Sequence, residues 1–169
     1  DKYIVGLTGR RAQVVRKSDM TLVGVIEGLS YVYRGDISPD EKTLLLASTD
    51  RYGYLYSLPD LTPMSRARIR DNKSGEVLEG LGCFSHDGSK VYFAVPLDNS
   101  LSEVREYDPI TFGFRRVVHE LDGMVIREIQ RLKNGIFLSG FCRGDEPYDI
   151  AVLYENGSVR KDKFDPQRS

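Results

Sequence analysis

The sequence has almost no net charge and no long apolar run. Its 24 lysines and arginines stand against 25 aspartates and glutamates, which gives a net charge of -1. A chain so balanced has no global attraction to nucleic acid or to an anionic membrane surface. It also lacks the run of about 18 apolar residues that a transmembrane helix requires. We therefore expect no nucleic-acid partner and no membrane span, while the compartment stays open.

Cysteine and histidine are too scarce to build a disulfide framework or a metal centre. The two cysteines, Cys83 and Cys142, stand in no CxxC spacing, and we interpret both as buried free thiols. His86 and His119 each neighbour a carboxylate, but no third ligand follows at metal-binding spacing. Glycine-rich phosphate loops, nucleophile elbows and HExxH motifs are also missing. We therefore expect no metal and no cofactor, and these absences favour a protein that is not an enzyme.

The sequence does contain one unit that is repeated several times. The segment "DISPDEKTLLLAS" at 36–48 returns as "CFSHDGSKVYFAV" at 83–95, with Ser38 and Ser85 47 residues apart. The glycines in "SHDGSKVYFA" and "RLKNGIFLSG" are separated by the same 47 residues, and "KYIVGLT" near the start resembles "KTLLLAS". These offsets predict four repeats, at about 1–29, 30–76, 77–123 and 124–169.

Each repeat consists of short strand signals separated by turns. Segments such as "KVYFAVP", "YGYLYSLP" and "DIAVLYENG" are rich in strand-forming residues and are bounded by turn residues. No window shows a helical period over three turns. A repeat of about 40 to 50 residues with four antiparallel strands is typical of a β-propeller blade, which buries its faces only between neighbouring blades. The sequence therefore predicts an all-β fold built from propeller blades.

The repeated segments also carry a family resemblance. The segments "SPDEKTLLLAS" and "SHDGSKVYFAV", followed by "LYSLPDLT" and "VREYDPITFG", resemble the repeats of WD-repeat-like and YVTN-type β-propellers. In that group a Ser-Pro-Asp-Gly-like turn joins the innermost strand of a blade to the second. The resemblance covers nearly the whole chain and implies the propeller architecture. It implies no single activity, since the group includes scaffolds, lactonases, dehydrogenase subunits and sensors.

The first repeat lacks its innermost strand. Repeats two to four begin with such a strand, at "SYVYRGDIS", "GLGCFS" and "VIREIQRL", whereas the first begins at "KYIVGLT", which matches a second strand. An open array of blades exposes apolar faces and strand edges. Residues 1–169 could be a single four-bladed domain with a defect, part of a larger propeller, or one of two copies that pair into an eight-bladed ring. We favour the larger propeller, because the sequence starts in the middle of a blade.

The predicted innermost strands carry the first candidate site. In a propeller these strands line the axial channel, where ligands and catalytic groups gather. Arg34, Asp36, Arg127 and Glu128 would therefore approach the axis. Such charges either bind a small polar ligand or neutralise one another as salt bridges. We favour mutual pairing, because the four residues form no recognisable constellation.

Tyrosines and arginines of the second repeat supply another candidate site. Tyr52 and Tyr54 belong to a tyrosine cluster in that repeat, and tyrosine is favoured both in recognition surfaces and within strands. Arg66, Arg68 and Arg70 alternate on a predicted outermost strand. They either bind an acidic partner or protect an exposed strand edge. We favour edge protection for the arginines and take the tyrosines as the first guess for a binding face.

Two Arg-Gly-Asp tripeptides occur, at 34–36 and at 143–145. The form resembles the integrin-binding motif, which must be presented on an exposed tip. The first tripeptide falls in a predicted strand. Only the second, with Arg143 and Asp145, falls in a predicted loop and is geometrically suited to such a contact.

These observations predict a non-catalytic β-propeller that acts as a binding or scaffolding module for a protein partner or a small polar ligand. The alternative is an enzyme resembling the lactonase-type propellers, acting on a small polar substrate at the axial channel. In that alternative Asp36 and Glu128 are the acid or base candidates, with Arg34 and Arg127 as anion clamps. Paired axial charges would favour the binding module, whereas unpaired, convergent carboxylates would favour the enzyme.

Overall fold

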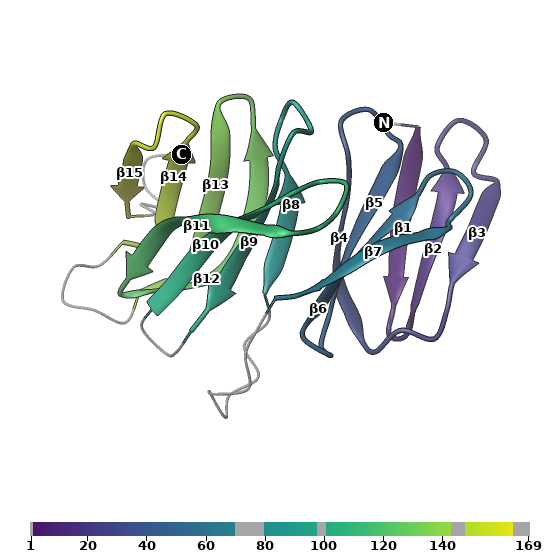
Figure 1. The fold of residues 1–169 in the computed structure, drawn as a ribbon, viewed down its shortest axis with the longest axis horizontal. Coiled ribbons are helices and arrows are strands. Elements are labelled where there is room, and N and C mark those ends of the chain that lie inside the picture. Colours follow the sequence, from purple (N-terminus) through teal and green to yellow (C-terminus); the bar gives the residue numbers. More distant parts are fainter. Residues whose placement is uncertain (1, 70–79, 98–100, 143–147, 164–169) are drawn as a thin grey trace.

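The chain folds into four small antiparallel sheets, shown as a ribbon in Figure 1. The computed structural model describes residues 2–69, 80–97, 101–142 and 148–163. Over these residues it contains fifteen strands, in one sheet of three strands and three sheets of four. The predicted all-β fold is confirmed, as is the prediction that the first repeat lacks a strand. None of the described residues belongs to a helix that could span a membrane.

Each sheet is a meander in which strands adjacent in sequence are also adjacent in space. Sheet A contains β1 (Tyr3–Thr8), β2 (Arg11–Arg16) and β3 (Leu22–Ile26). Sheet B contains β4 (Val32–Ile37), β5 (Thr43–Ser48), β6 (Tyr52–Ser57) and β7 (Pro63–Arg68). Sheet C contains β8 (Leu81–Phe84), β9 (Val91–Pro96), β10 (Leu101–Tyr107) and β11 (Phe114–Asp122). Sheet D contains β12 (Met124–Leu132), β13 (Gly135–Cys142), β14 (Ile150–Tyr154) and β15 (Val159–Asp162).

The repeated Ser-x-Asp motif forms the turn between the first two strands of sheets B and C. Ser38 Oγ donates to Asp40 Oδ1 at 2.6 Å, and Ser85 Oγ donates to Asp87 Oδ1 at the same distance. Each serine oxygen also accepts the backbone N–H five residues later, at 2.9 and 3.0 Å. Gly88 supplies the positive φ of 73° that the second turn requires. The motif therefore closes the hairpin and fixes its register.

Apolar side chains fill three cores, and each core lies between two consecutive sheets. The core between sheets A and B includes Val14, Leu44 and Leu46. The core between sheets B and C is aromatic, with Phe93, Tyr107 and Phe112 packed in tilted and edge-on contacts. The core between sheets C and D includes Val104, Met124, Ile129 and Leu138.

The central strands of the array are buried on both faces. Strand β9 (Val91–Pro96) is buried along its whole length, as are five of the six residues of β5. A strand covered on both sides needs no polar alternation, which explains the continuous apolar runs in the sequence. The innermost strands β4, β8 and β12 lie in a row, with β8 in the middle and in contact with the other two.

Candidate functional site

Charged side chains on the innermost strands form an axial network. Arg34 of β4 reaches across to β12, where its Nη2 lies 2.6 Å from Glu128 Oε1. The same nitrogen donates to the backbone oxygen of Ile129 at 2.5 Å. The Nε of Arg34 is buried and has no hydrogen-bond partner among the described residues. Arg34 thus ties sheet B to sheet D, past the intervening β8.

Asp36 provides the second link in the axial network. Its Oδ2 accepts the backbone N–H of Phe84 in β8 at 2.8 Å, and its Oδ1 accepts the N–H of Ile37 at 2.9 Å. Arg131 of β12 lies 3.9 Å from Asp36 Oδ1 and donates to the backbone oxygen of Ile37 at 3.1 Å. Asp36 therefore joins sheet B to sheet C through its hydrogen bond and to sheet D through the ion pair.

The axial network contains no activated nucleophile among the described residues. Cys83, next to Phe84 on β8, is a buried free thiol, as the sequence predicts, and burial raises its pKa well above the usual range. The negative charge of Asp36 raises that pKa further. A thiol that stays protonated is a poor nucleophile. The side chain of Cys142 lies outside what the structure describes.

Arg127 does not lie in the axial network, in contrast to the expectation from sequence. Its guanidinium carbon lies 5.4 Å from the centroid of the Phe141 ring, and both residues line one hollow on sheet D. The register of β12 shifts between Ile126 and Glu128, so that Arg127 has no paired residue on β13. The position that sequence analysis missed is Arg131, which takes part in the network instead.

A second cluster lies at one end of sheets A and B. Backbone hydrogen bonds join Val32 to Gly9, Thr49 to Tyr31 and Ile69 to Arg51, so that turns and strand ends of both sheets meet there. Six arginines and tyrosines of these turns and of the strands next to them are called the Tyr–Arg face below, namely Arg10, Tyr31, Arg51, Tyr52, Arg66 and Arg68.

The Tyr–Arg face combines exposed cations with aromatic rings. Tyr31 is 57% exposed, and the guanidinium carbon of Arg66 lies 5.1 Å from the centroid of the half-buried Tyr52 ring. Among the described residues, no carboxylate lies within ion-pair distance of Arg10, Arg51 or Arg66. Arg10, Arg51 and Arg66 therefore carry positive charge without an ion-pair partner in the described part of the chain.

Tyr54, next to this face, is half-buried and packs against the core between sheets A and B. Its hydroxyl donates to the carboxylate of Asp50. Burial raises the pKa of Tyr54, and the hydrogen bond to Asp50 raises it further. The Tyr54 ring also contacts the Tyr52 ring, with centroids 6.3 Å apart, so the two tyrosines that the sequence grouped lie side by side. Arg70, Arg143 and Asp145 lie outside the described residues, so the second Arg-Gly-Asp tripeptide cannot be placed.

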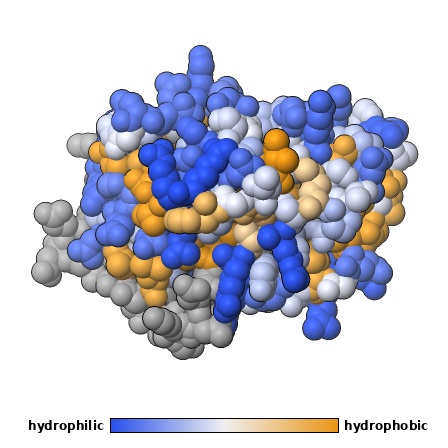
Figure 2. All heavy atoms as spheres, viewed as in Figure 1, coloured by the Kyte–Doolittle hydropathy of each residue, from blue (hydrophilic) through white to orange (hydrophobic). Residues whose placement is uncertain are grey.

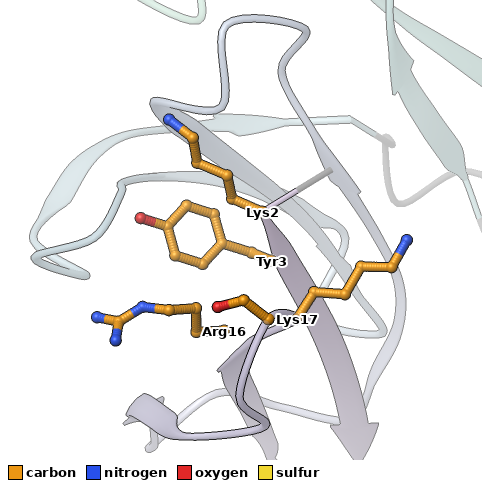
Figure 3. Close-up of a pocket in the computed structure, with 5 residues that line it drawn as sticks. Lys2, Tyr3, Arg16 and Lys17 are labelled. Atoms are coloured by element: carbon orange, nitrogen blue, oxygen red, sulfur yellow. The ribbon is translucent and has the colours of Figure 1, made fainter.

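A third candidate is a cationic hollow of about 510 Å³ beside the start of β1 (Figure 3). The Tyr3 ring lies between the side chains of Lys2 and Arg16, whereas the Lys17 side chain extends in the opposite direction. Lys2 is 3.8 Å from Glu41, and Arg16 is 3.3 Å from Asp19. Because carboxylates already face two of its cations, this hollow is a weaker anion site than the Tyr–Arg face.

Neither histidine takes part in a metal site within the described residues. His86 is exposed in the β8–β9 turn, and His119 is half-buried in β11. Burial lowers the pKa of His119, and so does the nearby charge of Lys161. No group of three or more potential ligands is found in the described ranges.

Comparison with known proteins identifies the fold. No family model and no curated protein matches the chain. Among solved structures, U3-55K matches with a TM-score of 0.73 and 12% identity, over 96% of this chain and 49% of that one. The WD40 repeats of RRP9 match with a TM-score of 0.72 and 12% identity, over 96% and 48%. Dihydro-heme d1 dehydrogenase NirN, in complex with DHE, matches with a TM-score of 0.68 and 14% identity, over 94% and 34%.

These matches also fix the extent of the similarity. The chain spans about a third to a half of the length of the solved chains to which it is similar. At these identities the likeness concerns the fold, and it agrees with the four antiparallel sheets and three inter-sheet cores described above. The chain therefore has the fold of a partial WD-repeat-like β-propeller, with four consecutive blades of which the first has three strands.

Proposed function

We propose that the protein is a non-catalytic binding module and that the Tyr–Arg face contacts an acidic segment of a protein partner. The observation that carries this proposal is that Arg10, Arg51 and Arg66, near Tyr31 and Tyr52, are exposed and have no carboxylate within ion-pair distance among the described residues. Tyrosine and arginine are the residue types most enriched among the residues that dominate binding energy. Unneutralised positive charge favours a negatively charged partner and accelerates its association.

The geometry of the axial network also supports the proposal, because it argues against the enzymatic alternative. A general acid or base must reach its substrate, and in the enzymatic alternative Asp36 and Glu128 would fill these roles. Here Asp36 accepts two backbone N–H groups, and Glu128 is paired with Arg34. The proposed anion clamps are also occupied or displaced, because Arg34 is engaged with β12 and Arg127 stacks on Phe141. These contacts favour a structural use of the axial charges.

The proposal is tested with a labelled oligo-glutamate peptide, followed by fluorescence anisotropy at low and high salt. The double variant Arg51→Gln/Arg66→Gln removes two cations of the Tyr–Arg face. We expect it to weaken binding about tenfold or more, since each tenfold corresponds to about 1.4 kcal/mol. The matched control is Arg160→Gln, because Arg160 lies on β15 at the far end of the array and is paired with Asp162. It should bind as the wild type does.

Two results would count against the proposal. Equal binding of oligo-lysine, or no effect of the double variant, would show that the Tyr–Arg face does not select acidic segments. Hydrolysis of aliphatic or aromatic lactones by the wild type, lost in both Asp36→Ala and Glu128→Ala while each variant stays folded, would instead support the enzymatic alternative.

A further inference from the structure

The four blades form an open arc. Three apolar cores join sheet A to B, B to C and C to D. Within the described residues no core joins sheet A to sheet D, and Figure 1 shows these two sheets at opposite ends of the molecule. A closed four-bladed ring would need a fourth core. Sheets A and D therefore each have one face that no other sheet covers.

The uncovered face of sheet A carries an apolar row next to the polar residues Gln13 and Arg11, the latter paired with Glu27. The strand register aligns Ile4, Val15 and Leu22 in one row across the three strands. Ile4 is 42% exposed, and Leu22 is 59% exposed. On the same face, Gly6 has no atom within 4 Å of the position that a Cβ would take. Figure 2 shows apolar residues at the right-hand margin, where sheet A lies.

The uncovered face of sheet D carries aromatic rings next to the charged residues Arg127 and Asp149. Phe137 and Phe141 alternate along β13 with Ile136 and Leu138, which point into the core shared with sheet C. Phe141 is 57% exposed. Together with Arg127 and other residues of β13 and β14, the two phenylalanines line a hollow of about 450 Å³. This face thus offers large rings and a cavity to whatever covers it.

The two uncovered faces are complementary in the way that the existing junctions are. Between sheets B and C, Gly53 leaves the space that the rings of Phe93 and Phe112 occupy, since a Cβ there would lie 2.9 and 2.8 Å from their ring carbons. Sheet A likewise offers the open space at Gly6, and sheet D offers the rings of Phe137 and Phe141. A junction of sheet D on sheet A would place these rings over the open space beside Gly6.

The comparisons indicate that the arc is part of a ring. The four sheets cover between 34% and 49% of four solved chains, with TM-scores of 0.67 to 0.73. Because propeller blades are arranged around a central channel, such an arc needs further blades to close, and one second copy is the smallest assembly of this chain that supplies them. A head-to-tail contact forms a closed ring when its rotation closes, and here two copies would suffice.

We propose that two copies of this chain close into one ring, with sheet D of each copy packed on sheet A of the other. The second copy supplies in trans the blades that a larger propeller would supply in cis. The ring would also complete the axial network, whose members Arg34, Asp36, Glu128 and Arg131 are 22–35% exposed at the open side of the arc. Two such networks would then line one shared channel. This inference is independent of the role proposed for the Tyr–Arg face.

The test is the mass of the chain in solution, measured by light scattering and by sedimentation equilibrium over a concentration series. The expected species has twice the chain mass of 19.1 kDa. Leu22→Asp and Phe141→Asp each place a charge on one of the two faces, and each alone should yield a monomer. Ile110→Asp is the matched control, because Ile110 is 70% exposed in the β10–β11 turn, away from both faces. It should remain dimeric, and far-UV circular dichroism should show strand structure in all three variants.

Mixing the two variants distinguishes this arrangement from other dimers. Leu22→Asp keeps an intact sheet D face and Phe141→Asp keeps an intact sheet A face, so an equimolar mixture should regain one junction and form a heterodimer. A dimer joined through two sheet A faces would be disrupted by Leu22→Asp only, and one joined through two sheet D faces by Phe141→Asp only. Either pattern, a monomeric wild type, or a ladder of larger species would overturn the proposal.

Discussion

Replacement of Asp36 tests whether the axial charges hold the blades together. In Asp36→Ala the N–H of Phe84 loses its acceptor, although Phe84 is only 1% exposed. An unsatisfied buried donor costs about 1–3 kcal/mol. The ion pair with Arg131 adds about 0–1 kcal/mol, because it is long and partly exposed to solvent. We therefore expect the free energy of unfolding to fall by about 2–3 kcal/mol. Asp36→Asn, which keeps an acceptor oxygen, should lose about half as much.

The assay is urea-induced unfolding, followed by tyrosine emission and circular dichroism because the chain contains ten tyrosines and no tryptophan. Asp60→Ala is the control, since Asp60 lies exposed in the β6–β7 turn, and surface changes of this kind are usually within about 0.5 kcal/mol. The slope of the unfolding free energy against urea concentration should stay unchanged, so that only the midpoint of the unfolding transition moves. If Asp36→Ala is no less stable than Asp60→Ala, the axial hydrogen bond does not join the sheets and the structural interpretation fails.

Two further predictions concern packing and pH. A Cβ at Gly82 would lie 2.7–2.9 Å from carbons of the buried Phe93 ring, so Gly82→Ala should destabilise the fold by about 1–3 kcal/mol in the same urea assay. The loss should shrink in a Phe93→Leu background, and an equal loss in both backgrounds would contradict the clash. The hydrogen bonds from the Ser85 hydroxyl and from the backbone N–H and hydroxyl of Ser89 lower the pKa of Asp87 from 3.8 to about 2. A lowered folded-state pKa stabilises the fold above pH 4, and this contribution is lost as the pH falls towards 2. Asp87→Asn should therefore flatten the decline in stability over that range relative to wild type, whereas Asp60→Asn should not.

The blades could be predicted from the sequence because the residues that form each turn lie within a few positions of one another. Ser38 and Ser85 make the same hydrogen bond to a carboxylate two residues later. Residues 47 positions apart in the sequence therefore occupy equivalent positions in sheets B and C. The buried runs of β5 and β9 have a similarly local cause, since a strand packed on both faces tolerates no polar position. Both features depend on short segments that can be recognised without any knowledge of their neighbours in space.

The axial partners could not be predicted, because they depend on register and on distance across sheets. Arg127 and Glu128 are adjacent in sequence and lie at a register shift of β12, yet Arg127 contacts Phe141 whereas Glu128 pairs with Arg34. Arg131 reaches Asp36 although 95 residues separate them in the sequence. The prediction that the axial charges pair among themselves holds for Arg34 and Glu128, whereas the choice of Arg127 as a member does not.

The same contacts indicate that the axial charges hold the blades in place and are not free to bind a ligand. Sheet D is not adjacent to sheet B, yet Arg34 and Asp36 bind it directly with charged groups that reach past β8. Such bonds shorten the inner side of the arc, whereas the apolar cores set the spacing between the blades farther out. If the axial charges were free to bind a ligand, the inner strands would lose these bonds and the curvature would depend on the cores alone. Arg10, Arg51 and Arg66 of the Tyr–Arg face take no part in these bonds, so a partner bound there, as proposed, would leave the axial contacts intact.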